Sequence, residues 1–181
     1  MNRRLPSEFT LAHDYCEYLS NGLADLLRQG EEMGSLEVNS RFEDPGMLKG
    51  LRDGETLELL AQLEQQGYHD ELGDILLRNT FPALLSDMHD FLSEALRCSQ
   101  TGRLCVAYSL LRKPLCENLL YLEWLLADGG TFISKLYNGP SEELVLHRPT
   151  FREVAIPRIE QAVAGLSFPG LHLPEFIYEL R

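Results

Sequence analysis

The sequence contains no phosphate loop, no G-x-G-x-x-G dinucleotide motif, no H-E-x-x-H zinc motif and no G-x-S-x-G nucleophile motif. Each absence disfavours a common class of enzyme, because those patterns place phosphate-binding amides, metal ligands or an activated serine. The chain also lacks an excess of positive charge, with 16 basic against 28 acidic side chains. An acidic surface repels phosphate backbones, so nucleic acid is an unlikely ligand.

Cysteine is scarce, and its spacing fits neither a zinc motif nor the disulfide framework of a small secreted protein. The first 20 residues carry three acidic side chains, which interrupt the apolar core that a signal peptide needs. These features predict a cytoplasmic protein with buried, reduced thiols. The four cysteines are Cys16, Cys98, Cys105 and Cys116.

Long uncharged apolar runs are also absent. Residues 103–128 come closest, but Arg112, Lys113, Pro114 and Glu117 lie in the middle of this stretch. Charges and proline at that position cost too much in hydrocarbon, so we expect no membrane span. A helix that is apolar almost all round is typical of a bundle interior. We therefore predict a buried central helix, kinked at Pro114 because proline removes one backbone donor.

Apolar residues recur at three-and-four spacing through most of the rest of the chain, which predicts helices. The expected fold is a single all-α domain, a bundle of six to eight helices, spanning residues 1–181. A long connector is expected at 31–52, and the helix at 174–181 is either cut short or a short packed terminus. The core helices are expected at 7–29, 82–100 and 103–127, with further helices at 55–66, 71–78, 132–137, 151–164 and 174–181. The predicted core positions are Leu19, Leu23, Leu85, Met88, Leu92, Leu96, Leu111, Leu115, Leu119, Leu122 and Trp124.

The polar residues around Pro114 form the candidate site. A buried Arg112 would need a carboxylate from another helix, because an unpaired buried charge is costly. One interpretation is a pocket for a ligand or substrate; the other is a structural cluster that fixes helix register. The candidate binding residues are Tyr108, Ser109, Arg112, Glu117 and Tyr121.

Histidine offers little further chemistry. His13 could face a metal together with Glu17 at i+4 or Cys16 at i+3, but such a pair supplies only two ligands. No second helix repeats the spacing, and a solvated pair is the preferred interpretation. We therefore predict no catalytic residue, no metal and no cofactor.

The pattern A-x-x-L-L-R-x-x-L-x-E, formed by Ala107, Leu110, Leu111, Arg112, Leu115 and Glu117, resembles a helix of certain uncharacterised bacterial all-helical proteins, some grouped near the HEPN superfamily. The resemblance implies a helical bundle that is often dimeric. Many HEPN proteins are ribonucleases whose motif is an arginine followed a few residues later by histidine. That motif is absent here, because Arg78 reaches His89 only after ten intervening residues.

Together these patterns predict a non-enzymatic intracellular interaction or regulatory protein. One form that this prediction covers is a component of a bacterial stress or defence system. Residues 1–100 hold 19 acidic and 8 basic side chains. The protein would act through this acidic half or by self-association, for example as a homodimer, with neither a membrane nor nucleic acid as partner. The alternative is an enzyme or small-ligand binder with a pocket at Pro114, of which a HEPN-like ribonuclease is the specific form.

Overall fold

A computed structural model describes residues 5–34, 56–138, 151–164 and 174–179, without the side chains of residues 56–59, 138, 151, 176 and 177. All regular structure in these ranges is helical, which confirms the all-α prediction. None of the helices in them combines the length and apolarity needed to cross a membrane. The predicted connector lies outside the described residues from position 35 on, as do positions 180 and 181 of the terminal helix.

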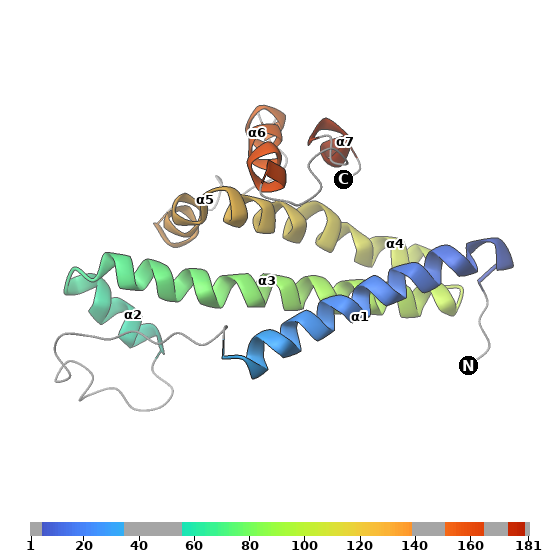
Figure 1. Cartoon of the computed structure of the whole chain (residues 1–181), viewed down its shortest axis with the longest axis horizontal. Helices are drawn as coiled ribbons and strands as arrows, with labels where there is room; N and C mark the ends of the chain where they lie inside the picture. The colour runs from blue at the N-terminus through green and yellow to red at the C-terminus, as the bar shows by residue number, and fades with distance from the viewer. Residues whose placement is uncertain (1–4, 35–55, 139–150, 165–173, 180–181) are drawn as a thin grey trace.

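The long helix α3 is the axis of the fold. Helices α1, α2, α4 and α5 and the turn η3 all contact it, while α6 packs on α5 and α7 on α6 (Figure 1). The turn η3 is π-helical and joins α4 to α5. In chain order the elements are η1 (Ser7–Phe9), α1 (Thr10–Glu32), α2 (Thr56–Gln65), α3 (His69–Gln100), α4 (Leu104–Lys113), η3 (Pro114–Asn118), α5 (Leu119–Asn138), α6 (Phe151–Ala164) and α7 (Pro174–Glu179).

Helix α3 joins two segments that were expected to be separate helices, at 71–78 and 82–100. Pro82 lies inside it and does not end it. Proline leaves the carbonyl group four residues earlier without its helical donor. That carbonyl belongs to Arg78, which is exposed, so water can replace the lost hydrogen bond. The predicted break at Pro82 is therefore wrong.

Two glycines close the turns on either side of α3. Gly67 (φ +82°) follows α2, and Gly102 (φ +79°) follows α3. After α2, the amide of Tyr68 donates to the carbonyl of Leu63, and the amide of Gly67 donates to that of Glu64. After α3, the amides of Arg103 and Gly102 donate in the same way to the carbonyls of Cys98 and Ser99. This is the Schellman ending, in which glycine takes the left-handed position without strain. The predicted turns at these two glycines are confirmed.

Helix α5 is interrupted at Asp128, whose backbone leaves the helical region (φ −155°, ψ 77°). Its side-chain Oδ1 accepts a hydrogen bond from the amide of Thr131 at 3.1 Å, as an N-cap residue does. A side-chain hydrogen bond from Thr131, followed by this bond from its backbone amide, lowers the pKa of Asp128. The helices predicted at 103–127 and 132–137 are thus separated at Asp128.

The best-packed part of the core lies where the two parts of α5 fold over α3. Trp124, Phe132 and Ile133 are buried there. The Trp124 and Phe132 rings meet edge to face, with centroids 5.3 Å apart. From α6, the guanidinium carbon of Arg158 lies 3.4 Å from the centroid of the Trp124 ring. Partly buried hydrophobic residues complete the cluster: Leu76, Leu77, Leu84, Tyr121 and Leu125.

The predicted core positions differ in how far they are buried. Leu85 and Trp124 are buried as expected, whereas Leu19 and Leu115 are exposed, so their prediction is wrong. Leu115 lies in η3. Exposed apolar residues on α4, such as Leu104 and Tyr108, show that this helix is not the fully buried element that its apolar sequence suggested. The remaining predicted positions are partly buried: Leu23, Met88, Leu92, Leu96, Leu111, Leu119 and Leu122.

Candidate functional site

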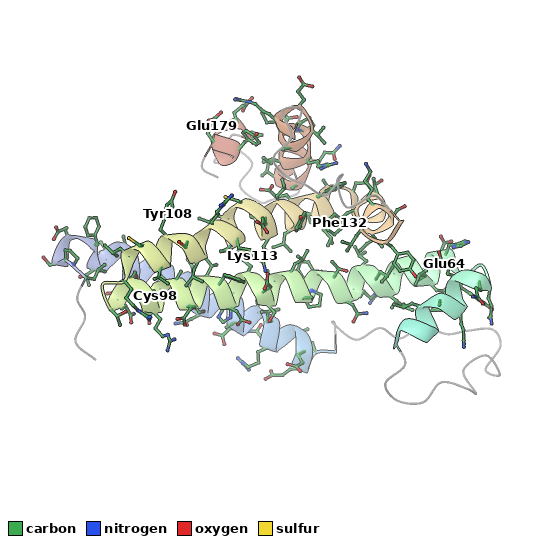
Figure 2. All side chains as sticks on the ribbon, turned by 180° about the vertical axis from the view of Figure 1, so that it is seen from behind. Glu64, Cys98, Tyr108, Lys113, Phe132 and Glu179 are labelled. Atoms are coloured by element: carbon green, nitrogen blue, oxygen red, sulfur yellow. The ribbon has the colours of Figure 1, made fainter. Side chains whose placement is uncertain are left out.

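The predicted polar residues around Pro114 are spread over α4, η3 and α5. Tyr108 is 80% exposed and projects away from α3 (Figure 2). Ser109 is exposed and donates to the carbonyl of Cys105 at 2.9 Å. Arg112 is also exposed, so the expectation of a buried arginine is wrong. Glu117 and Tyr121 lie together and are partly buried; burial, and then the charge of Glu117, raise the pKa of Tyr121.

The buried polar contact between η3 and α3 involves different residues. Asn118 is 1% exposed, and its Nδ2 donates to Oδ2 of Asp87 at 2.8 Å and to the carbonyl of Leu84 at 3.3 Å. Lys113 reaches the same Asp87 oxygen at 2.8 Å, between α4 and α3 (Figure 2). Its ammonium also lies 4.5 Å from the centre of the Phe91 ring. Lys113, Asn118 and Asp87 therefore fix η3 against α3, as a structural cluster would.

This contact makes the free energy of unfolding depend on pH. The hydrogen bond from Lys113, followed by that from Asn118, lowers the pKa of Asp87 below its usual 3.8. Because the unfolded chain then binds more protons, Asp87 contributes its full stabilisation above about pH 4 and loses it on acidification through the lower folded pKa. We expect the stability difference between wild type and Asp87→Asn to shrink below about pH 4. Urea unfolding from about pH 3 to 7 measures it; a difference that grows in acid would contradict the assignment.

Helix α1 turns a polar face toward α3. His13 and Ser20 are its buried residues, although neither is apolar. The hydroxyl groups of Ser20 and Ser93 are 3.1 Å apart, and Nε2 of His13 lies 3.2 Å from the carbonyl oxygen of Leu96. From α3, Nε2 of Gln100 donates to Oε2 of Glu17 at 3.4 Å. These hydrogen bonds join the two helices, and Leu23 and Leu27 of α1 are partly buried as well.

The exposed apolar residues of α1 lie on the opposite side of the helix. At 3.6 residues per turn, Tyr15 is roughly 160° around the helix from His13. Leu19, Leu26 and Met33 follow at intervals of seven residues, which keeps them near one line along the helix surface. We call the exposed set the α1 stripe: Leu11, Tyr15, Tyr18, Leu19, Leu26 and Met33.

Of this stripe, sequence periodicity assigned Leu19 to the core. The assumption was that the more apolar side of an amphipathic helix faces its neighbours. The missed signal was the second pattern, in which His13, Glu17, Ser20 and Ala24 recur at three-and-four spacing and the first three carry polar groups able to pair with α3. Of these, His13 and Ser20 are buried and the other two partly buried.

Helix α4 has an exposed apolar side of its own. Leu104 and Tyr108 are exposed, as is Leu115 in the adjoining η3. Cys105 on α4 and Cys16 on α1 are exposed as well, Cys116 is partly buried and only Cys98 is buried. The prediction of four buried thiols is therefore wrong for two of them.

A cavity of about 580 Å³ lies between α2, the start of α3 and the second part of α5. Leu76, Leu77 and Ile133 form part of its wall, and Glu64, Asp70 and Asp74 give it acidic groups. The Tyr137 hydroxyl donates to Oε2 of Glu64 at its edge, at 3.4 Å. The residues predicted around Pro114 do not line it.

Among these features the α1 stripe is the hardest to explain by the packing of this chain alone, because its apolar side chains are exposed. Contiguous exposed apolar surface is typical of an interaction site. Near Pro114, Lys113 and Asn118 both pair with Asp87 inside the fold, so these polar groups have a structural role. No protein-family model matches the chain, and neither a curated protein nor a solved structure matches it.

Proposed function

We propose that this protein is a non-enzymatic intracellular interaction or regulatory protein that acts by self-association through the α1 stripe. One observation carries the proposal: α1 exposes its apolar side and buries His13 and Ser20. Fully burying a leucine or aromatic side chain contributes roughly 1.5–3 kcal/mol. Leu19, Leu26 and their neighbours therefore have a substantial free energy to gain from a partner surface.

Charge favours α4 of a second copy as that surface. Helix α1 carries five acidic side chains and one basic side chain, Arg28. Residues 103–116 carry Arg103, Arg112 and Lys113 and no acidic side chain. Two α1 helices brought together would repel, whereas α1 on α4 joins apolar sides of opposite charge. In a two-fold dimer this contact forms twice, since each copy offers both helices.

The size of the surface sets the expected strength. Helices of 23 and 10 residues are about 35 and 15 Å long, and a strip about 10 Å wide along both covers about 500 Å² per copy. Stable interfaces bury about 800 Å² per partner. We therefore expect a dimer that dissociates on dilution.

The first test introduces one charge into the stripe. Leu19→Glu should shift the monomer–dimer equilibrium at least about tenfold toward monomer, because binding would desolvate the new carboxylate. Native mass spectrometry and light scattering over a concentration series measure the change. Asn21→Glu adds the same charge on an exposed position roughly 160° away and should leave the dimer intact.

The two exposed thiols identify the facing helices. Copies keeping Cys16 but not Cys105 or Cys116 are mixed with copies keeping Cys105 but not Cys16 or Cys116, and treated with a short bismaleimide. Covalent pairs between the two kinds of copy support α1 on α4. Pairs formed by the Cys16 copies alone would instead indicate α1 on α1, and a chain that is monomeric at every concentration would refute self-association.

Three finer predictions belong to this proposal. The bundle is proposed to have six to eight helices with a central helix bent at Pro114. A HEPN-like relationship is proposed from the resemblance around Arg112, and with it a role in bacterial stress or defence. The HEPN arginine–histidine pair is absent, so this resemblance is used for architecture and not for nuclease activity.

A second candidate function is binding of a small molecule. The cavity between α2, α3 and α5 favours it, since about 580 Å³ is within the usual range for ligand sites. Its acidic groups Glu64, Asp70 and Asp74 favour a cationic ligand with an apolar body. The same native mass spectra report a retained ligand as added mass that disappears on denaturation.

A further inference from the structure

One turn of α1 brings together three groups that can bind a metal ion. Single ligand atoms of His13, Asp14 and Glu17 all lie within 4.8 Å of one another. The sequence pattern indicated only a pair of ligands, because Asp14 at i+1 is not an obvious partner for a histidine on an ideal helix. The folded chain supplies a third, which is the number of protein ligands in many open zinc sites.

His13 is buried with one of its ring nitrogens unsatisfied. Its side chain is 7% exposed, and Nδ1 has no hydrogen-bond partner. A buried polar atom without a partner costs free energy, so it needs a physical explanation. The other nitrogen, Nε2, is 3.2 Å from the carbonyl oxygen of Leu96, which can only accept a hydrogen bond. Nε2 must therefore carry the proton, and in the neutral ring Nδ1 keeps its lone pair.

This arrangement matches the second shell of a metal-binding histidine. Such a histidine usually donates its other N–H group to a backbone carbonyl or a carboxylate, which fixes the tautomer and orients the ring. Leu96 fills that role for His13. Gln100, which donates to Oε2 of Glu17, orients one of the carboxylates in the same manner. Both supporting groups come from α3, so the fold and not α1 alone positions the ligands.

We propose that His13, Asp14 and Glu17 form a binding site for a divalent transition-metal ion, with Nδ1 of His13 and one oxygen of each carboxylate as ligands. One imidazole and two carboxylates suit zinc and its neighbours better than calcium, which prefers six or more oxygen ligands. Three protein ligands leave a coordination position open. The ion would also offset two negative charges on acidic α1.

Titration of the full-length chain with Zn²⁺ by calorimetry tests the site directly. We expect one ion per chain with a dissociation constant in the micromolar range or below. Glu17→Gln and Asp14→Asn should each weaken binding at least about tenfold, since each loses a charged ligand. Asp14 is exposed and Glu17 only partly buried, so we expect both variants to fold. The control is Glu8→Gln, which removes a nearby exposed carboxylate and should leave binding unchanged.

Co²⁺ substitution tests the identity of the ligands. Visible d–d absorption without a sulfur charge-transfer band is expected, and Cys16→Ser should not change it. His13→Asn should abolish the spectrum. Because His13 is buried, far-ultraviolet circular dichroism is used to check that this variant folds. If it does not fold, the Glu17→Gln and Asp14→Asn variants test the ligands instead. A sulfur band would overturn the assigned ligands. Binding only at millimolar Zn²⁺, or binding unaffected by the carboxylate variants, would overturn the site.

Discussion

Replacing Trp124 by alanine is expected to lower the free energy of unfolding by about 3–5 kcal/mol, the usual loss for a large buried aromatic residue. The ring is buried and lies edge to face with Phe132. It is also covered by the guanidinium group of Arg158, whose pKa is lowered mainly by burial. Removing the ring therefore opens a cavity between α5 and α3 and deprives a partly buried cation of its aromatic partner.

Trp124 is the only tryptophan, so unfolding of this variant has to be followed by far-ultraviolet circular dichroism in urea. Leu126→Ala is the matched control, because Leu126 is on the same helix but exposed. The free energy of unfolding of Leu126→Ala should stay within about 0.5 kcal/mol of the wild-type value. A Trp124→Ala variant that loses less than about 1 kcal/mol would show that the packing of α6 on α5 does not depend on this ring.

Asn118→Ala is expected to have the second large effect, lowering the free energy of unfolding by about 2–3 kcal/mol. The change removes two hydrogen bonds from a buried side chain, one of them to the charged Asp87, and hydrogen bonds to charged groups contribute about 1.5–3 kcal/mol. It also leaves the Leu84 carbonyl without its side-chain donor. The effect is measured by urea unfolding near neutral pH, with Ser109→Ala on the exposed side of α4 as the control.

Asn118→Asp separates the hydrogen bonds from side-chain volume. It keeps the size of the side chain but places a second carboxylate 2.8 Å from Asp87, where the amide donor now stands. Two such carboxylates resist simultaneous ionisation. We expect this variant to be less stable than wild type at neutral pH and to recover part of the loss on mild acidification. Equal losses at both pH values would assign the effect to packing alone.

The helices, their turns and the break near Asp128 followed from sequence because each depends on nearby residues. Gly67 and Gly102 determine their turns through backbone conformation, which no distant contact needs to supply. Pro82 was misjudged since a proline costs one hydrogen bond, and only the fold decides whether water can compensate at Arg78.

The orientation of α1 could not be predicted for a different reason. Periodicity shows that Leu19 and Leu26 share one side of a helix, but which neighbour that side meets depends on contacts far along the chain. His13 is bonded to Leu96 and Ser20 to Ser93, separations of 83 and 73 residues. The polar contact between η3 and α3 was missed similarly, because Asn118 meets Asp87 only once these two elements are packed.

The polar attachment of α1 has a consequence for how the molecule opens. A helix held by hydrogen bonds gains little from them in net free energy, since water offers the same bonds to the detached helix. Trp124, Phe132 and Ile133 are on α5, so α1 takes no part in the best-packed cluster. We therefore expect helix α1 to be a separate unit of low stability, able to leave α3 while the rest of the bundle stays folded.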